Sequence, residues 1–223
     1  MIRAQLKQIP EQAVLMYLSY RGSFLPEEIR EDLQRCSQII LETARPRAVW
    51  REFDWNPDGP LPGTSFTPAG QDIRNLLRDS KKVILFGATL GTEVDQLLRR
   101  EQVRNMGEAV ILDACASAAI ENVCDNLCED FAREADGFLT DRFSPGYGDF
   151  PFSQQPDFCQ VLDMARRIGV CLSPTGLMIP QKSVTALLGI ADTPQPRRFR
   201  GCETCSAFEH CTYRKGGTTC GRI

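Results

Sequence analysis

The sequence has a single histidine and no surplus of positive charge, and both shortages narrow the possible functions. Its 223 residues include 26 lysines and arginines against 29 aspartates and glutamates, which gives a formal net charge of −3. A general nucleic-acid-binding protein carries a basic surplus, so we expect no nucleic-acid partner. The one histidine, His210, lies far in sequence from the segment 141–151 discussed below, and no Ser–His or Cys–His arrangement typical of nucleophilic catalysis is found. We therefore assign no catalytic residue.

Long hydrophobic runs are also missing. No apolar stretch reaches the roughly 18 residues that a membrane span needs, so we expect no membrane partner. The N-terminal segment MIRAQLKQIPEQ has neither the apolar core nor the cleavage site of a secretory signal, so we expect a cytoplasmic protein. GATLGTEV (87–94) lacks the spacing of a phosphate-binding loop and any P-loop lysine. We interpret it as a strand-to-helix turn, with a ligand cleft at the helix N-terminus as the alternative.

Helical and strand patterns alternate irregularly along the chain. Apolar residues recur at helical spacing over 26–44, 106–134 and 157–169, whereas 48–55 and 81–91 are typical of strands. Because these elements follow no strict βαβ repeat, we predict an α+β fold: a twisted, mainly antiparallel sheet flanked by helices. We expect two further strands within 172–191, joined around Pro180 and Gln181.

The predicted main domain covers residues 1–191. Residues 192–201, DTPQPRRFRG, are typical of a linker, so 192–223 is predicted to be a linker with a cysteine-rich tail.

The segment DRFSPGYGDFP (141–151) is too rich in glycine and proline for a helix interior or a central strand. Arg142 offers a planar fork suited to a carboxylate. Gly146 and Gly148 let the backbone approach a ligand closely, and Tyr147 presents a flat face and a hydroxyl. These features suit an amino acid joined to an aromatic base. The competing interpretation is a turn that uses glycine and proline for conformational reasons alone.

Taken with its flanks, this segment resembles the R-x-x-x-G-Y signature of the activation domain of cobalamin-dependent methionine synthase. ACASAAIENVCDNL (114–127) resembles the helix upstream of that signature, and RRIGVCLSPTGLMIPQKSVTALLGIA (166–191) resembles the family's later stretch. The likeness covers roughly residues 10–191, and it is greatest to the stand-alone version of the domain. It implies a curved antiparallel sheet with helices, and S-adenosylmethionine as ligand.

The resemblance also implies which residues bind this ligand: Arg142, Gly146, Tyr147, Gly148, Asp149 and Glu121. Arg142 would meet the methionyl carboxylate, and the 146–149 segment would hold the adenosyl part. Glu121 would attract the amino group or the sulfonium, although a solvated helix position is the alternative. Where the family has G-Y-P-A, this chain has G-Y-G-D. Glycine is expected to preserve the tight turn in place of proline, and Asp149 to place a charge beside the adenine.

The function implied is a reactivation module for a cobalamin-dependent methionine synthase or a related corrinoid protein. It would support reductive methylation of cob(II)alamin carried by that partner, with a flavodoxin or ferredoxin as electron donor. Its contribution would be mainly proximity, so we expect a methyltransferase component that does not turn over alone. The alternative is a metal or iron–sulfur electron-transfer accessory, or a docking protein for a corrinoid methyltransferase, that does not bind S-adenosylmethionine.

Four of the ten cysteines fall within the last 22 residues: Cys202, Cys205, Cys211 and Cys220. Their spacing suits a tetrahedral zinc site or an iron–sulfur cluster, with His210 able to replace one thiolate. Redox-active or unpaired thiols are the alternative. The six earlier cysteines are scattered, and we expect them to be small core residues.

Metal analysis and a visible spectrum of the anaerobically purified protein test the tail. We expect about one zinc per chain or the absorption of a cluster, because four thiolates complete a tetrahedral site. A chain truncated after Ala191 should lose the metal and still melt as a folded domain. A colourless, zinc-free sample of the full chain would contradict both metal interpretations.

Overall fold

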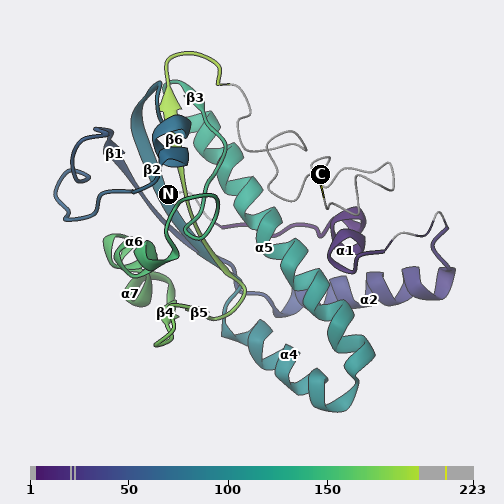
Figure 1. The fold of residues 1–223 in the computed structure, drawn as a ribbon. Helices are drawn as coiled ribbons and strands as arrows, with labels where there is room; N and C mark the ends of the chain where they lie inside the picture. The colour runs from purple at the N-terminus through teal and green to yellow at the C-terminus, as the bar shows by residue number, and fades with distance from the viewer. Residues whose placement is uncertain (1–3, 21, 23, 196–208, 210–223) are drawn as a thin grey trace. The chain divides into compact units, whose positions relative to one another are not determined.

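The computed structural model describes residues 4–20, 22, 24–195 and 209, and the fold is α+β, as predicted (Figure 1). The elements follow in this order: α1 (Glu11–Tyr17), α2 (Glu27–Thr43), β1 (Arg47–Asp54), α3 (Gln71–Leu76), β2 (Ser80–Thr89), α4 (Thr92–Arg104), α5 (Met106–Glu134), β3 (Phe138–Leu139), the 3-10 helix η1 (Phe152–Gln154), α6 (Gln155–Leu162), α7 (Met164–Ile168), β4 (Cys171–Leu172), β5 (Met178–Ile179) and β6 (Ser183–Ala191).

The long helices form where the sequence predicts them. In α2, Leu33, Cys36 and Ile40 are buried at helical spacing, and two glutamates occupy the first turn, where negative charge favours the helix. Helix α5 spans 106–134 as predicted. Its start is fixed by Asn105, whose side-chain oxygen accepts the Glu108 N–H at 3.3 Å.

Two local predictions were wrong. The helix predicted over 157–169 is two helices, α6 and α7, because Asp163 between them adopts a left-handed conformation with φ 51°. Aspartate tolerates that conformation better than most residues, so it allows the break. The second is wrong only in part: two strands, β5 and β6, do lie on either side of Pro180 and Gln181, but β5 pairs with an additional strand, β4, in a short hairpin.

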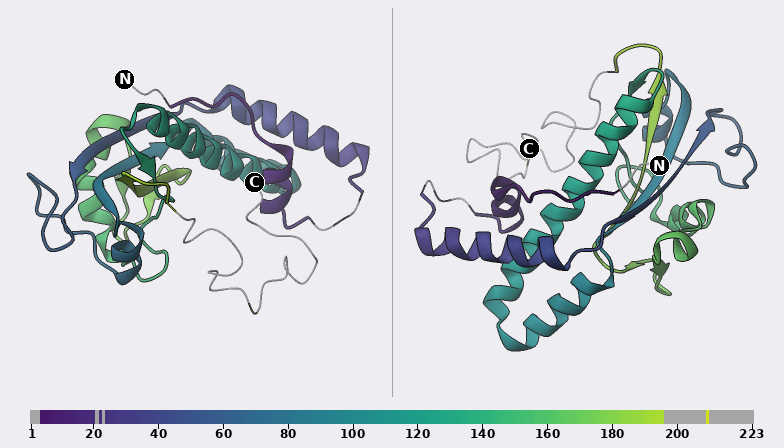
Figure 2. Two further views of the ribbon diagram at one scale, coloured as in Figure 1. Left: turned by 90° about the horizontal axis from the view of Figure 1, so that it is seen from above. Right: turned by 180° about the vertical axis from the view of Figure 1, so that it is seen from behind.

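The chain divides into two compact units that interleave along the sequence. The first takes Ala88–Asp130 and Met164–Val184 together with the chain up to Val49, and the second takes Trp50–Gly87, Phe131–Asp163 and the chain from Thr185 onward. The first unit is mainly helical. There α2 crosses α5 (Figure 2), and Ser37 Oγ lies 3.5 Å from Cys115 Sγ between the two helices.

The sheet has the strand order β1-β2-β6-β3. β3 pairs antiparallel with β6, with Phe138 opposite Ala191. The Trp55 N–H donates to Lys81 O at 2.8 Å, so the end of β1 meets the start of β2; the Leu90 N–H donates to Lys182 O at 2.9 Å, so the end of β2 meets the start of β6. These contacts make the sheet antiparallel, as predicted. The central strands β2 and β6 are almost continuously buried.

An aromatic cluster fills part of the second unit. The Phe131 ring, 2% exposed, lies 5.5 Å from Trp50 and 5.7 Å from Phe86, measured between ring centroids. Tilted and edge-on arrangements of this kind are favourable for aromatic pairs. The cluster joins β1 and β2 to the last turn of α5.

Replacing Phe131 with alanine should lower the free energy of unfolding by about 3–5 kcal/mol, because it removes a buried ring and leaves a cavity. Urea denaturation monitored by circular dichroism measures the loss. Phe131→Leu, which keeps most of the apolar volume, should lose less. A loss below about 1 kcal/mol for the alanine variant would contradict the central place of this ring in the core.

Candidate functional site

Residues 144–150 form a closed turn in the second unit, which we call the tip turn. The turn follows Phe143, whose N–H and carbonyl each bond to Leu187 at 2.9 Å. Within the turn, the Gly146 N–H donates to Phe150 O at 2.8 Å and the Tyr147 N–H to Ser144 O at 3.1 Å. The Phe150 N–H donates back to Tyr147 O at 2.9 Å. The turn is therefore ordered by its own backbone hydrogen bonds.

The tip turn is buried at its base and exposed at its end. Phe143 and Phe150, on either side, are 7% and 1% exposed, whereas residues 146–149 are all exposed. The Tyr147 side chain is 67% exposed, and its ring centroid lies 6.5 Å from that of Phe143. Two buried phenylalanines thus anchor a solvent-facing tyrosine.

Asp149 supplies the N-cap that helix α3 lacks. The N-cap position of α3 is Gly70, which has no side chain to accept a hydrogen bond. Asp149 instead accepts the Gln71 N–H at 2.6 Å and the Asp72 N–H at 3.0 Å through its two carboxylate oxygens. Asp72 Oδ2 accepts the Asp149 N–H in return, at 3.1 Å. The carboxylate therefore neutralises part of the positive end of α3.

Gly148 makes a turn that proline cannot make. Its φ is +52°, whereas the proline ring fixes φ near −65°. A Cβ added at Gly148 would also collide with Asp72 Oδ2 and lie 3.0 Å from the edge of the Phe143 ring. The tight turn expected with glycine in place of proline is present, and G-Y-G-D forms it with a φ at position 148 that proline does not adopt.

Gln154 holds the same two segments together at a second point. Its amide nitrogen donates to Thr67 O and its amide oxygen accepts the Ala69 N–H, both at 2.8 Å. Residues 67–72 are therefore fastened along 149–154 by Gln154 at one end and by Asp149 at the other. The sequence offered one signal for this contact, since a helix start with glycine at the N-cap needs an acceptor from elsewhere.

The structure brings together most of the predicted ligand-binding residues. Gly146, Tyr147, Gly148 and Asp149 form the exposed end of the tip turn, and half-buried Arg142 directly precedes its base. Glu121 is half-buried on α5 in the first unit. Asp72 and Gln154 were missed, because their partners are far away in sequence: Asp149 of the tip turn for Asp72, and Thr67 and Ala69 for Gln154. The roles of all six predicted residues in binding stay predictions.

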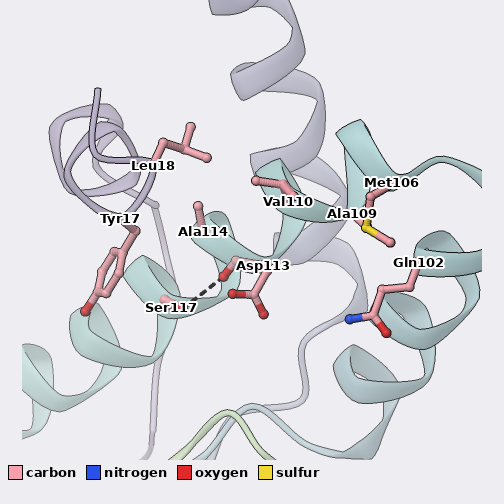
Figure 3. Close-up of a pocket in the computed structure, with 9 residues that line it drawn as sticks. All are labelled: Tyr17, Leu18, Gln102, Met106, Ala109, Val110, Asp113, Ala114 and Ser117. Atoms are coloured by element: carbon pink, nitrogen blue, oxygen red, sulfur yellow. Dashed lines mark hydrogen bonds between the residues drawn. The ribbon is translucent and has the colours of Figure 1, made fainter. Parts of the chain in front are cut away.

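The first unit has a cleft of about 330 Å³ (Figure 3), lined by Tyr17, Leu18, Gln102, Met106, Ala109, Val110, Asp113, Ala114 and Ser117. Asp113 and Ser117 both contact Lys182 Nζ at 2.8 Å. The polar side of the cleft is thus bonded within the protein. None of the six predicted ligand-binding residues lines it.

Three of the six described cysteines are core residues, as expected, and Cys128 and Cys159 are half-buried. Cys36, Cys115 and Cys124 are buried, but Cys171 is exposed, contrary to the prediction. Burial and the nearby Cys115 thiol raise the pKa of Cys36 to about 12, so Cys36 stays protonated at neutral pH. In the described part of the chain, no three His, Cys, Asp or Glu side chains gather as a metal site. The tail cysteines, Cys202, Cys205, Cys211 and Cys220, lie outside it.

Replacing Asp149 with alanine should lower the free energy of unfolding by about 1–2 kcal/mol, because α3 loses the acceptor for two N–H groups. The matched control is Asp58→Ala, which removes an exposed carboxylate 3.6 Å from Arg74. It should change stability by less than about 0.5 kcal/mol. Chemical denaturation of both variants measures the change in the free energy of unfolding. Equally small losses of stability in the two variants would contradict the capping role of Asp149.

Comparison with known proteins finds no matching family model and no matching curated protein. In the described residues, no helix is both long and apolar enough to cross a membrane. Among solved structures, the chain matches the crystal structure of the MetH reactivation domain bound to AdoHcy. The TM-score is 0.63 over 92% of this chain and 80% of that one, at 15% sequence identity. The chain therefore shares the fold of the MetH reactivation domain, the domain that the sequence resembles.

Proposed function

We propose that this chain binds S-adenosylmethionine at the tip turn and acts as a reactivation module for a cobalamin-dependent methionine synthase or a related corrinoid protein. The observation that carries the proposal is the firmly held, solvent-facing segment 146–149, in a chain with the fold of a reactivation domain that was crystallised with AdoHcy. Arg142, next to the tip turn, supplies a guanidinium for the carboxylate of such a ligand. Exposed Tyr147 supplies an aromatic face for its adenosyl part.

The residues of the tip turn fit the chemistry of this ligand. The Arg142 guanidinium suits its carboxylate, and Gly146, with no Cβ, leaves room for its adenosyl part. The N–H groups of Gly146, Tyr147 and Asp149 already bond within the protein. We therefore expect the adenosyl group to be recognised by the tyrosine face and by backbone carbonyl oxygens, and not by these three N–H groups.

The role of the chain in this function is to bind and orient. S-adenosylmethionine, when bound, supplies an electrophilic methyl group, and cobalamin belongs to the partner protein. The chain would hold the ligand in a fixed position while it docks on the partner, which lowers the entropic part of the barrier. This function requires no general acid or base from the chain. An electron donor such as a flavodoxin or ferredoxin would act on the partner.

The metal or electron-transfer alternative depends on the sequence of the tail. If the chain is a docking protein without a small ligand, it should not bind S-adenosylmethionine, whereas the proposed function requires that binding. Co-purification with a cobalamin-loaded methionine synthase that lacks its own reactivation domain tests the partner.

Arg142→Ala should weaken the binding of S-adenosylmethionine at least about tenfold, because a charged hydrogen-bonding partner of the carboxylate is lost. Isothermal titration calorimetry measures the affinity. Arg78→Ala is the matched control, since Arg78 is an exposed arginine of the same unit whose guanidinium lies 3.7 Å from the neighbouring Asp79 carboxylate. It should bind as the wild type does.

Two outcomes would contradict different parts of the proposal. No binding by the wild type up to millimolar ligand would rule out the function. Binding that is equal in the wild type and in Arg142→Ala would leave the function in place and reject Arg142 as the partner of the carboxylate.

A further inference from the structure

One exposed aromatic side chain lies in the tip turn and another just after it. In the described part of the second unit, three large hydrophobic side chains are exposed: Phe138 (47%), Tyr147 (67%) and Phe152 (44%). The last two lie five residues apart, with one inside the tip turn and the other just after it. Exposed aromatic rings gathered at one place are more informative than single exposed residues, because such patches mark binding sites.

Phe152 lies against the bare face of Gly146. A Cβ added at Gly146 would be 3.4 Å from Phe152 Cδ2 and 3.8 Å from Phe152 Cβ, which is ordinary van der Waals contact. Gly146 also has a φ of +93°, which side chains rarely adopt. The glycine thus keeps one side of the Phe152 ring free of any neighbouring side chain at position 146. Tyr147 is the next residue in the chain after this glycine.

The backbone beneath both rings is held by contacts already present in the protein. Phe152 begins η1, and Gln154 at the end of η1 bonds to Thr67 and Ala69. Tyr147 is followed by Gly148 and by Asp149, which is bonded to α3. Because the backbone segments that carry the rings are already ordered, the protein loses little backbone conformational entropy when a ligand binds to them.

We propose that Phe152 is a second aromatic contact of the ligand, and that Phe152 and Tyr147 receive the purine ring of an adenosyl compound beside Gly146. This inference rests on the proposed function and names the part of the ligand that the tip turn recognises. The N–H groups of Gly146, Tyr147 and Asp149 already donate hydrogen bonds within the protein. The turn therefore offers few donors that could hydrogen-bond to the edge of a base. Contact with the face of the ring, which every purine has, is therefore the main way in which the turn would recognise the base.

Phe152→Ala should weaken the binding of S-adenosylmethionine by at least about fivefold, the range expected for losing one base–aromatic contact. Phe138→Ala is a matched control, since it removes an aromatic ring of nearly equal exposure from β3 of the same unit. Calorimetry on the full chain should find that Phe138→Ala binds S-adenosylmethionine with the same affinity as the wild type. Adenosine, which lacks the methionyl part, should compete with the ligand on the wild type and less well on Phe152→Ala.

Two conservative variants separate ring contact from structural support. Phe152→Leu keeps an apolar side chain without a flat ring, so it should stay folded and bind as weakly as Phe152→Ala. Phe152→Trp should bind as well as the wild type and change its fluorescence on addition of ligand, while Phe138→Trp should not. The leucine variant also decides the matter if the alanine variant fails to fold.

The outcomes distinguish this inference from the proposed function. Suppose that the wild type binds S-adenosylmethionine, that Arg142→Ala binds it weakly, and that Phe152→Ala or Phe152→Leu binds it with the affinity of Phe138→Ala. The proposed aromatic contact is then wrong, and the proposed function stands. If the wild type binds neither S-adenosylmethionine nor AdoHcy, the function fails and the aromatic contact fails with it.

Discussion

The hydrogen bonds between the Asp149 carboxylate and the start of helix α3 are the interaction on which the candidate site depends. They complete a helix whose own N-cap is Gly70, and they fix the exposed end of the tip turn to a regular element. The return bond from the Asp149 N–H to Asp72 makes the contact reciprocal. The tip turn is closed by its own backbone hydrogen bonds, and the contact with α3 additionally restrains its exposed, glycine-containing end.

A chain can share this fold at 15% identity because the fold itself depends on few specific residues. The fold needs apolar residues at the right spacing, and the buried positions of α2, α5, β2 and β6 supply them. The tip turn needs a stable shape, which different contacts can provide. In a Gly-Tyr-Pro turn the proline ring restricts the backbone directly. Here a contact between two segments, 71–72 and 149, supplies the restriction.

The parts of the structure that the sequence predicts are those set by local patterns. Helix α5 and the buried face of α2 follow from the period of their apolar residues, and the exposed tip turn follows from its glycines and prolines. The break at Asp163 depends on one left-handed residue, which no periodicity reveals. Asp149 was interpreted as a charge beside a ligand, because its partners on α3 lie 77 and 78 residues away.

The left-handed conformation of Gly148 has a consequence for which substitutions this segment tolerates. A single Gly148→Pro exchange toward the Gly-Tyr-Pro pattern meets an incompatible φ, and a single change at Asp149 leaves α3 uncapped. Either single change should therefore destabilise the tip turn of this chain. In physical terms, residues 72, 148 and 149 act as one unit, because the φ of Gly148 places Asp149 where it bonds to the start of α3.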